Sequence, residues 1–171
     1  MPLNTHELPL AKLLLDCLRG ALTVDHPNPP TYFSLRVGEE VAHDLSQYED
    51  LCCEGLAYVK INTVYPSSQF PQPDDTYSPC QMEWATDLEM GVLRCAPVGD
   101  LEHIPTDAEW TATAEQVAHD SAAMRAAIAS FCNSMEPGAG WLPRPWSPVG
   151  AQGGCTGGTQ VLTVGFIQDG C

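Results

Sequence analysis

Two long segments with the periodicity of β-strands constrain the fold of this chain most. Residues 56–65 (LAYVKINTVY) are rich in β-branched and aromatic side chains, and residues 82–92 alternate between larger apolar and mostly polar side chains. Period-two alternation places the two sets of side chains on opposite faces of a sheet. The two segments therefore predict strands of one sheet that has a buried face and a polar face.

Two helices are predicted from apolar side chains at helical spacing. Residues 5–20 follow a capping-box pattern that begins at Asn4, and residues 106–133 follow a second one made by Thr106 and Glu109. The first helix is leucine-rich nearly all round, which indicates contact on two sides, one of them with a neighbouring subunit. The second helix carries one apolar stripe, made of Trp110, Ala114, Val117, Ser121, Met124, Ile128 and Phe131.

Two more strands complete the predicted fold. Residues 32–37 alternate, and residues 159–167 are apolar on both faces, as in an interior strand. The polar segment 39–50 is read as a helical turn or loop. The order α-β-β-β-α-β predicts an α+β fold with a mainly antiparallel sheet and two principal helices packed on one face. Residues 1–171 form one domain in this reading, with a long hairpin loop at 66–79 and an irregular Pro/Gly-rich excursion at 136–158.

The charge of the chain limits its partners. Twenty-two acidic residues against seven Lys and Arg give a formal net charge of −15, so most of its surface repels nucleic-acid phosphates. No stretch reaches the roughly 18 consecutive apolar residues of a membrane span, and the N-terminus lacks the basic start of a secretory signal. We therefore expect a protein made in the cytoplasm that binds neither nucleic acid nor membrane.

The eight cysteines are first read as reduced, small, buried side chains, because cytosolic thiols stay reduced. No CxxC pair occurs, and the adjacent Cys52 and Cys53 would point to opposite faces of a strand, so no zinc site is predicted. Disulfides remain open for a particle that spends time in an oxidising medium. The positions to test first would be Cys80 with Cys95 and, flanking the last loop, Cys132 and Cys155.

The usual pointers to catalysis are missing from the sequence. It holds no GxxxxGK(S/T) phosphate loop, and its five histidines lie scattered through different predicted elements, so each is read as a surface or capping residue. His119 and Asp120, as immediate neighbours on a helix, are not expected to face a common site. We expect a non-enzymatic protein with no cofactor and no metal.

Four segments resemble the tail-assembly and neck proteins of long-tailed (siphovirus) phages that infect actinobacteria. The segments are residues 52–71 (CCEGLAYVKINTVYPSSQFP), 84–97 (WATDLEMGVLRCAP), 120–132 (DSAAMRAAIASFC) and 150–164 (GAQGGCTGGTQVLTV). Within that group the predicted element order is similar to tail terminators. The resemblance implies a virion structural protein that forms a homo-hexameric ring on the major tail tube protein and then joins the tail to the head connector or stopper, with genomic DNA passing through the lumen without specific binding.

Seven side chains are candidates for the contacts of such a ring. They are two of the few cations and the aromatic residues in or beside the long loops: Arg36, Tyr65, Phe70, Tyr77, Arg94, Trp141 and Trp146. The competing interpretation is that these aromatic side chains pack their own loops against the core.

Three other functions stay open at this point. A head-to-tail stopper or adaptor would form its ring on the connector side of the same joint. A small cytosolic enzyme would use a cysteine or a bound zinc ion. An acidic imitation of DNA would bind a basic host protein as a monomer.

Overall fold

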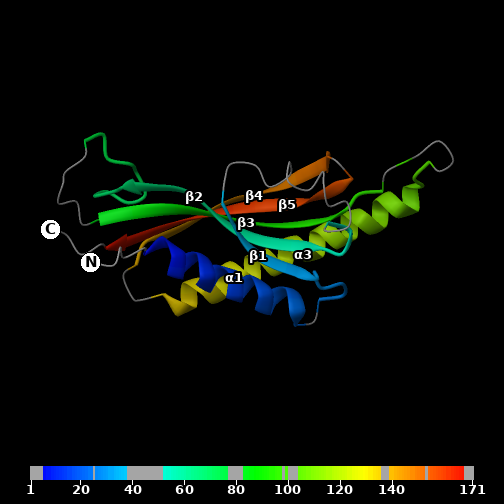
Figure 1. The fold of residues 1–171 in the computed structure, drawn as a ribbon, viewed down its shortest axis with the longest axis horizontal. Helices are drawn as coiled ribbons and strands as arrows, with labels where there is room; N and C mark the ends of the chain where they lie inside the picture. The colour runs from blue at the N-terminus through cyan, green and yellow to red at the C-terminus, as the bar shows by residue number, and fades with distance from the viewer. Residues whose placement is uncertain are drawn as a thin grey trace.

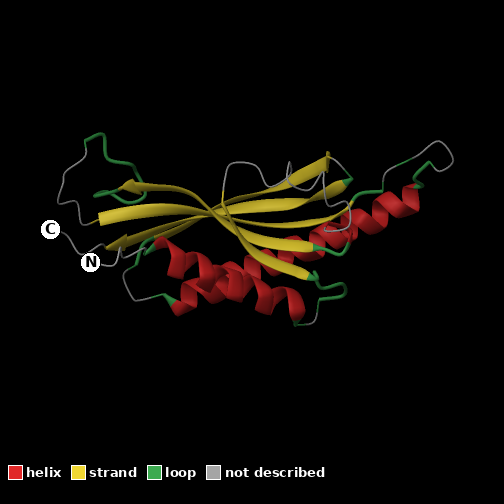
Figure 2. Cartoon of the chain, in the orientation of Figure 1, coloured by secondary structure: helices red, strands yellow, loops and turns green. Residues whose placement is uncertain are grey.

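The described part of the chain forms one five-stranded sheet with two helices on one face (Figures 1 and 2). The computed structural model describes residues 6–24, 26–37, 52–76, 83–97, 99, 104–135, 139–152 and 154–167. In chain order the elements are α1 (Glu7–Thr23), β1 (Tyr32–Val37), β2 (Leu56–Pro66), β3 (Glu83–Cys95), α3 (Asp107–Ser134), β4 (Trp141–Gln152) and β5 (Cys155–Ile167). The predicted α+β class is confirmed.

The sheet is mainly antiparallel, as predicted. Its strand order is β1-β2-β3-β5-β4, and only β1 and β2 run parallel to each other. The two segments with the strongest strand pattern, β2 and β3, lie side by side in an antiparallel pair that contains one irregularity between Ile61 and Thr63. That irregularity keeps Thr63 opposite Asp87, so polar side chains continue along the face away from the helices.

The core lies between the sheet and the helices. Alternate side chains of β2, β3 and β5 meet α1 and α3 there, and the fully buried members include Leu14, Leu18, Val59, Leu88, Met90, Met124, Phe131 and Leu162. Burying one such side chain contributes roughly 1.5–3 kcal/mol relative to leaving it in water. The leucine-rich circumference of α1 is explained within the chain, because α1 packs on β1, β2 and α3. Its second apolar side therefore belongs to α3 and not to a neighbouring subunit.

The helix boundaries agree closely with the sequence patterns. At α3 the capping box is present: the Thr106 hydroxyl accepts from the Glu109 N–H at 3.3 Å, and the Glu109 carboxylate accepts from the Thr106 N–H at 2.7 Å. At α1 the helix begins at Glu7 and its N-cap position is His6, so Asn4, which lies outside the described residues, is not the cap.

The segment predicted as an irregular excursion contains a strand, β4. Residues 141–152 pair with β5 at the edge of the sheet, and the register shifts between Pro143 and Trp146 and again between Val149 and Gln152. Proline lacks the N–H that a central strand needs on both sides, but an edge strand has a partner on one side only. The prediction of 136–158 as irregular, made from its Pro and Gly clusters, was wrong because an edge strand accepts proline on its unpaired side.

The first part of the predicted 66–79 loop is compact. The Ser67 N–H donates to the Glu83 carbonyl at 3.0 Å, the Asp74 N–H donates to the Pro66 carbonyl at 2.9 Å, and the Ser67 hydroxyl donates to the Gln72 carbonyl at 2.8 Å. The loop thus closes on the ends of β2 and β3. Residues 77–79 and the polar segment 39–50 lie outside the described residues. Among the described helices, none is long and apolar enough to cross a membrane.

The N-terminal end of α3 extends past the strands (Figure 1). No residue between 104 and 118 is buried, whereas burial on α3 begins at Asp120 and continues through Phe131. The predicted apolar stripe is therefore only half used by the core: Ser121, Met124, Ile128 and Phe131 are buried, while Trp110 and Ala114 are exposed and Val117 is intermediate. We call residues 104–118 the α3 arm.

Candidate functional site

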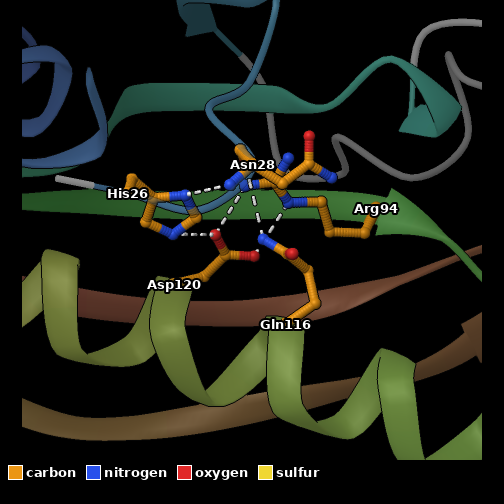
Figure 3. Close-up of polar contacts among 5 residues, drawn as sticks. All are labelled: His26, Asn28, Arg94, Gln116 and Asp120. Atoms are coloured by element: carbon orange, nitrogen blue, oxygen red, sulfur yellow. Dashed lines mark hydrogen bonds and ion pairs between the residues drawn. The ribbon is translucent and has the colours of Figure 1, made fainter. Parts of the chain in front are cut away.

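A buried polar cluster joins three separate parts of the chain (Figure 3). Arg94 comes from the end of β3, Asp120 from the middle of α3, and His26 from the connection between α1 and β1. The Arg94 guanidinium donates from Nε to Asp120 Oδ2 at 2.9 Å and from Nη2 to Oδ1 at 2.6 Å. The Arg94 and Asp120 side chains are only 6% and 2% exposed, so this two-pronged pair is shielded from water.

The His26 ring completes the cluster from the other side of the carboxylate. Its Nδ1 accepts from the Asn28 backbone N–H at 3.3 Å, so the proton of the neutral ring is assigned to Nε2. Nε2 lies 3.2 Å from Asp120 Oδ1, without the angle of a good hydrogen bond. The contact is therefore mainly electrostatic. The Gln116 side chain donates to the Asn28 carbonyl at 3.5 Å and ties the same connection to α3 (Figure 3).

The chemistry of this cluster is that of a structural ion pair. Both carboxylate oxygens of Asp120 are engaged by Arg94, and the side chains of His26 and Asp120 are only 3% and 2% exposed. A buried pair of this kind costs desolvation, which the two hydrogen bonds offset. Within the described part of the chain, no group of three or more His, Cys, Asp and Glu side chains is arranged to hold a metal ion. The expectation that His26 is a surface or capping residue was wrong.

A second internal polar group lies on the face of the sheet opposite the helices. The Tyr58 hydroxyl donates to Glu89 Oε1 at 3.0 Å, and Lys60 Nζ lies 3.3 Å from the same oxygen. Burial, and next the neighbouring Glu89 charge, raise the pKa of Tyr58 far above its ordinary value. Lys60 is 5% exposed, so this cation too is used inside the molecule.

Four cysteines are joined as two disulfides at one end of the sheet. Cys52 is bonded to Cys155 and Cys53 to Cys95, while Cys95 and Cys155 are direct partners across β3 and β5. Cys52 and Cys53 lie in a short helical turn and not in a strand, which lets both neighbours reach the same strand pair. The expectations that these thiols are reduced and that the adjacent pair points to opposite faces of a strand were wrong.

The two remaining described cysteines, Cys17 and Cys132, are free and partly buried on the packed helices. Burial raises the pKa of the Cys132 thiol, and the nearby Cys17 raises it further. A raised pKa lowers the fraction of Cys132 that is thiolate at neutral pH. Cys80, one of the positions proposed for a disulfide, lies outside the described residues.

Three of the predicted interface aromatics pack against their own chain. The Tyr65 hydroxyl donates to the Pro71 carbonyl at 3.2 Å within the compact loop. The Phe70 ring lies on two glycines, since a Cβ at Gly140 would be 2.8 Å from Phe70 Cδ1 and one at Gly165 would be 3.0 Å from Cδ2. These two side chains therefore follow the interpretation in which loop aromatics secure their own loop.

Trp146 is the third of these aromatics. It packs against the main core, and its indole covers Gly158 so closely that a Cβ there would overlap the ring. A neighbouring subunit is not needed to explain this side chain.

The other four predicted interface residues have four different outcomes. Trp141 is 46% exposed on β4 and stays available to a partner. Arg36 is partly buried and donates from Nε to the Ser34 hydroxyl at 3.0 Å. Arg94 is paired with Asp120 inside the molecule, so we no longer count it among the interface residues. Tyr77 lies outside the described residues.

Sequence reasoning missed the buried cluster and the α3 arm. A signal for the cluster existed in Asp120, an acid on the otherwise apolar stripe side of α3, but nothing local identified Arg94 and His26 as its partners. The arm was hidden because its stripe pattern continues into the packed half of the helix without a break.

No family model matches the chain, and no curated protein matches its sequence.

Proposed function

We propose that the chain is a structural subunit of a tailed-phage virion, a tail terminator that forms a ring at the head-side end of the tail tube. The resemblance of residues 52–71, 84–97, 120–132 and 150–164 to tail-assembly and neck proteins supports this function. So does the α+β arrangement of two helices on one face of a mainly antiparallel sheet, which is similar to what the resemblance implies for tail terminators.

The observation that carries the proposal is the location of the charged and the apolar side chains. Arg94, Asp120, Lys60 and Glu89 are paired inside the molecule, while the α3 arm projects with exposed apolar side chains and without a buried residue. An enzyme would be expected to direct such polar groups into an accessible cleft. A subunit of an assembly would instead keep its exposed apolar groups for neighbouring subunits.

The disulfides favour a protein that works outside a reducing cytosol. Two disulfides that tie a turn to the ends of β3 and β5 suit a particle that leaves the cell, where an oxidising medium maintains them. Assembly in the host cytoplasm followed by oxidation in the released virion fits this chemistry. They also count against the enzyme that relies on free cysteines or zinc.

Genomic DNA would pass such a ring without being gripped. The net charge of −15 leaves few cations for phosphates, and Lys60 and Arg94 are buried. The partners would be other copies of the chain, the tail tube protein and the head connector or stopper. A stopper or adaptor in the neck is the nearest alternative, and it shares every feature named above.

Locating the polypeptide in purified particles tests the proposal. Electron microscopy with an antibody against the chain should place six copies at the tube end, and deletion of the gene should give tails of uncontrolled length that do not join heads. Label in the neck beyond the tube would favour the stopper or adaptor. Particles that have tails of normal length after deletion of the gene would contradict the proposal.

A further inference from the structure

We propose that the four disulfide-bonded cysteines form a redox latch. They are Cys52, Cys53, Cys95 and Cys155. In the oxidised chain the two bonds fasten residues 52–55, which we call the cysteine turn, to the paired ends of β3 and β5. In the reduced chain the cysteine turn is released together with the start of β1. The inference goes beyond the proposed function, because it applies to any chain that passes from a reducing to an oxidising medium.

The anchor of the latch is the pair of strands β3 and β5. They pair along their whole length without a shift of register, and the ladder ends where Cys95 lies opposite Cys155. Just beyond that end, the Ala96 N–H donates to the Gly154 carbonyl at 2.7 Å. Backbone hydrogen bonds make this ladder, and they do not depend on the state of the sulfur atoms. The anchor therefore stays in place when the thiols are oxidised or reduced.

The part that the latch holds is the cysteine turn. The Gly55 N–H donates to the Cys52 carbonyl at 3.0 Å and closes the turn on itself. Gly55 has a φ of +84°, a conformation that glycine adopts at little cost. The two adjacent cysteines then reach different strands, since Cys52 is bonded to Cys155 on β5 and Cys53 to Cys95 on β3. Sulfur thus fastens one short turn to both strands of the anchor.

The start of β1 is attached to the cysteine turn. The Thr31 N–H donates to the Glu54 carbonyl at 3.0 Å, and the Tyr32 N–H donates to the Gly55 carbonyl at 3.0 Å. Tyr32 is the first residue of β1, and β1 is an edge strand that pairs with β2 alone. An edge strand lacks the second neighbour that holds a central strand. The position of the cysteine turn therefore determines where β1 begins.

The cysteine turn also borders the buried polar cluster. A Cβ at Gly55 would lie 2.6 Å from Arg94 Nη1 and 2.9 Å from Pro30 Cα, so Gly55 is packed between the guanidinium and the connection that leads into β1. Arg94 is paired with Asp120, and His26 belongs to the same connection. Movement of the turn would change the packing around both Arg94 and His26.

One of the two bonds is open to reagents in solution. Cys53 and Cys95 are exposed, whereas Cys52 and Cys155 are buried. When a pair of thiols closes, it gives up two electrons and two protons, and a low-molecular-weight disulfide such as oxidised glutathione accepts them and leaves as two thiols. A dithiol such as dithiothreitol reverses the step and becomes a disulfide itself. The exposed bond is the one that meets either reagent first.

Amide hydrogen exchange of the oxidised and the dithiothreitol-reduced full chain, at one pH, tests the latch. The amides of Thr31, Tyr32 and Gly55 should exchange at least about tenfold faster in the reduced chain, because their hydrogen bonds open locally. The amide of Ser67 is the internal control. It donates to the Glu83 carbonyl at the opposite end of the β2–β3 pair, and its exchange should not change.

The His26 ring provides a second readout. Its NMR signals should shift on reduction, because the cysteine turn borders the connection that carries this ring. Mass spectrometry after alkylation confirms that each sample is fully oxidised or fully reduced. Unchanged His26 signals together with unchanged exchange at Thr31 and Tyr32 would overturn the latch.

Cysteine variants identify the sulfur atoms responsible. A variant in which all four cysteines of the latch are serine should exchange at the rate of the reduced chain in both buffers. A matched variant with Cys17→Ser and Cys132→Ser, which lacks only the free thiols, should keep the full difference between oxidised and reduced protein. Loss of that difference in the matched variant would overturn the assignment.

The distinction between a latch and an ordinary stabilising crosslink lies in where exchange accelerates. Acceleration of the same size at Ser67 and at Thr31 would mean that reduction destabilises the whole fold, which overturns the latch. So would loss of helix content in the reduced chain, measured by circular dichroism. None of these outcomes bears on where the polypeptide lies in a particle, which the localisation experiment decides separately.

Discussion

Arg94 and Asp120 are 26 positions apart in the sequence and hold each other through two hydrogen bonds, 2.9 and 2.6 Å long, in the interior of the molecule. Removing one member leaves the other charge buried without its partner, which costs about 3–5 kcal/mol. Arg94→Ala should therefore lower the free energy of unfolding by about that amount in a denaturant titration. Arg144→Ala, at an exposed arginine on β4, should change it by less than about 0.5 kcal/mol.

Replacing both members of the pair separates their interaction from the space they fill. Arg94→Met combined with Asp120→Leu should recover much of the lost stability, because no unpaired charge remains. Equal stability of the Arg94→Ala and Arg144→Ala proteins would contradict the buried pair.

A thiol reductant should open the two disulfides one after the other. Cys53 and Cys95 are exposed, whereas Cys52 and Cys155 are buried at 1% and 5% exposure, so a thiol reductant should open the first bond before the second. Alkylation at intervals, read by mass spectrometry, gives the order. The bonds span sequence separations of 103 and 42 residues, and in the loop-entropy model they destabilise the unfolded chain by about 4.7 and about 4 kcal/mol, respectively.

Serine variants provide the matched comparison for the disulfides. Cys53→Ser should lower the melting temperature in the absence of reductant, while Cys17→Ser, at a free cysteine, should have little effect. A melting temperature that reductant does not change would show that the disulfides contribute nothing measurable.

Stability should fall in alkaline solution partly because of Tyr58. Burial and the Glu89 charge raise the pKa of Tyr58 in the folded chain, whereas an unfolded tyrosine ionises near about 10. The contribution is fully present below that pH and is lost as the pH rises above it, because the unfolded state then gives up a proton that the folded state keeps. Unfolding free energies at pH 8 and pH 11 should therefore differ less for Tyr58→Phe than for wild type.

Tyr65 is the natural comparison for Tyr58. Burial, followed by the Asp87 charge, also raises the pKa of Tyr65, but this side chain is only partly buried, and Arg144 acts in the opposite direction. Tyr65→Phe should thus reduce the alkaline loss by less than Tyr58→Phe. The reverse ranking would contradict the burial of the Tyr58 hydroxyl against Glu89.

The two tryptophans of β4 should respond differently to truncation. Trp146→Ala removes a ring that packs on the core and covers Gly158, and large-to-small changes of this kind cost about 3–5 kcal/mol when fully buried. Because Trp146 is only partly buried, a loss nearer the lower value is expected. Trp141→Ala should change the unfolding free energy little, because that side chain is 46% exposed. Similar losses for both variants in thermal melts would contradict the packing of Trp146.

The sequence predicts local structure well where one pattern governs it. The strand at 32–37 has the predicted limits, and the capping box at Thr106 begins α3 as expected. Both depend on neighbours in the chain: alternation of side chains in the first case and reciprocal hydrogen bonds across one turn in the second. The α+β class, and the placement of both helices on one face of the sheet, were predicted from the order of such elements.

The missed features depend on which distant segments meet. Cys52 and Cys53 could be assigned to the strand pair at Cys95 and Cys155 only once β3 and β5 were known to be neighbours. Likewise, the periodicity of α3 does not reveal where the sheet beneath it ends, so Trp110 carries the same pattern as buried residues. The candidate interface was affected most, because loop aromatics that fold back and those that reach outward have the same local sequence signals.

The prolines of β4 also restrict how copies of this chain can aggregate. Pro143, Pro145 and Pro148 interrupt the row of N–H donors that an incoming strand would need along this border. A further polypeptide therefore cannot extend the hydrogen-bonded ladder smoothly from β4, which guards this margin of the molecule against open-ended fibre growth.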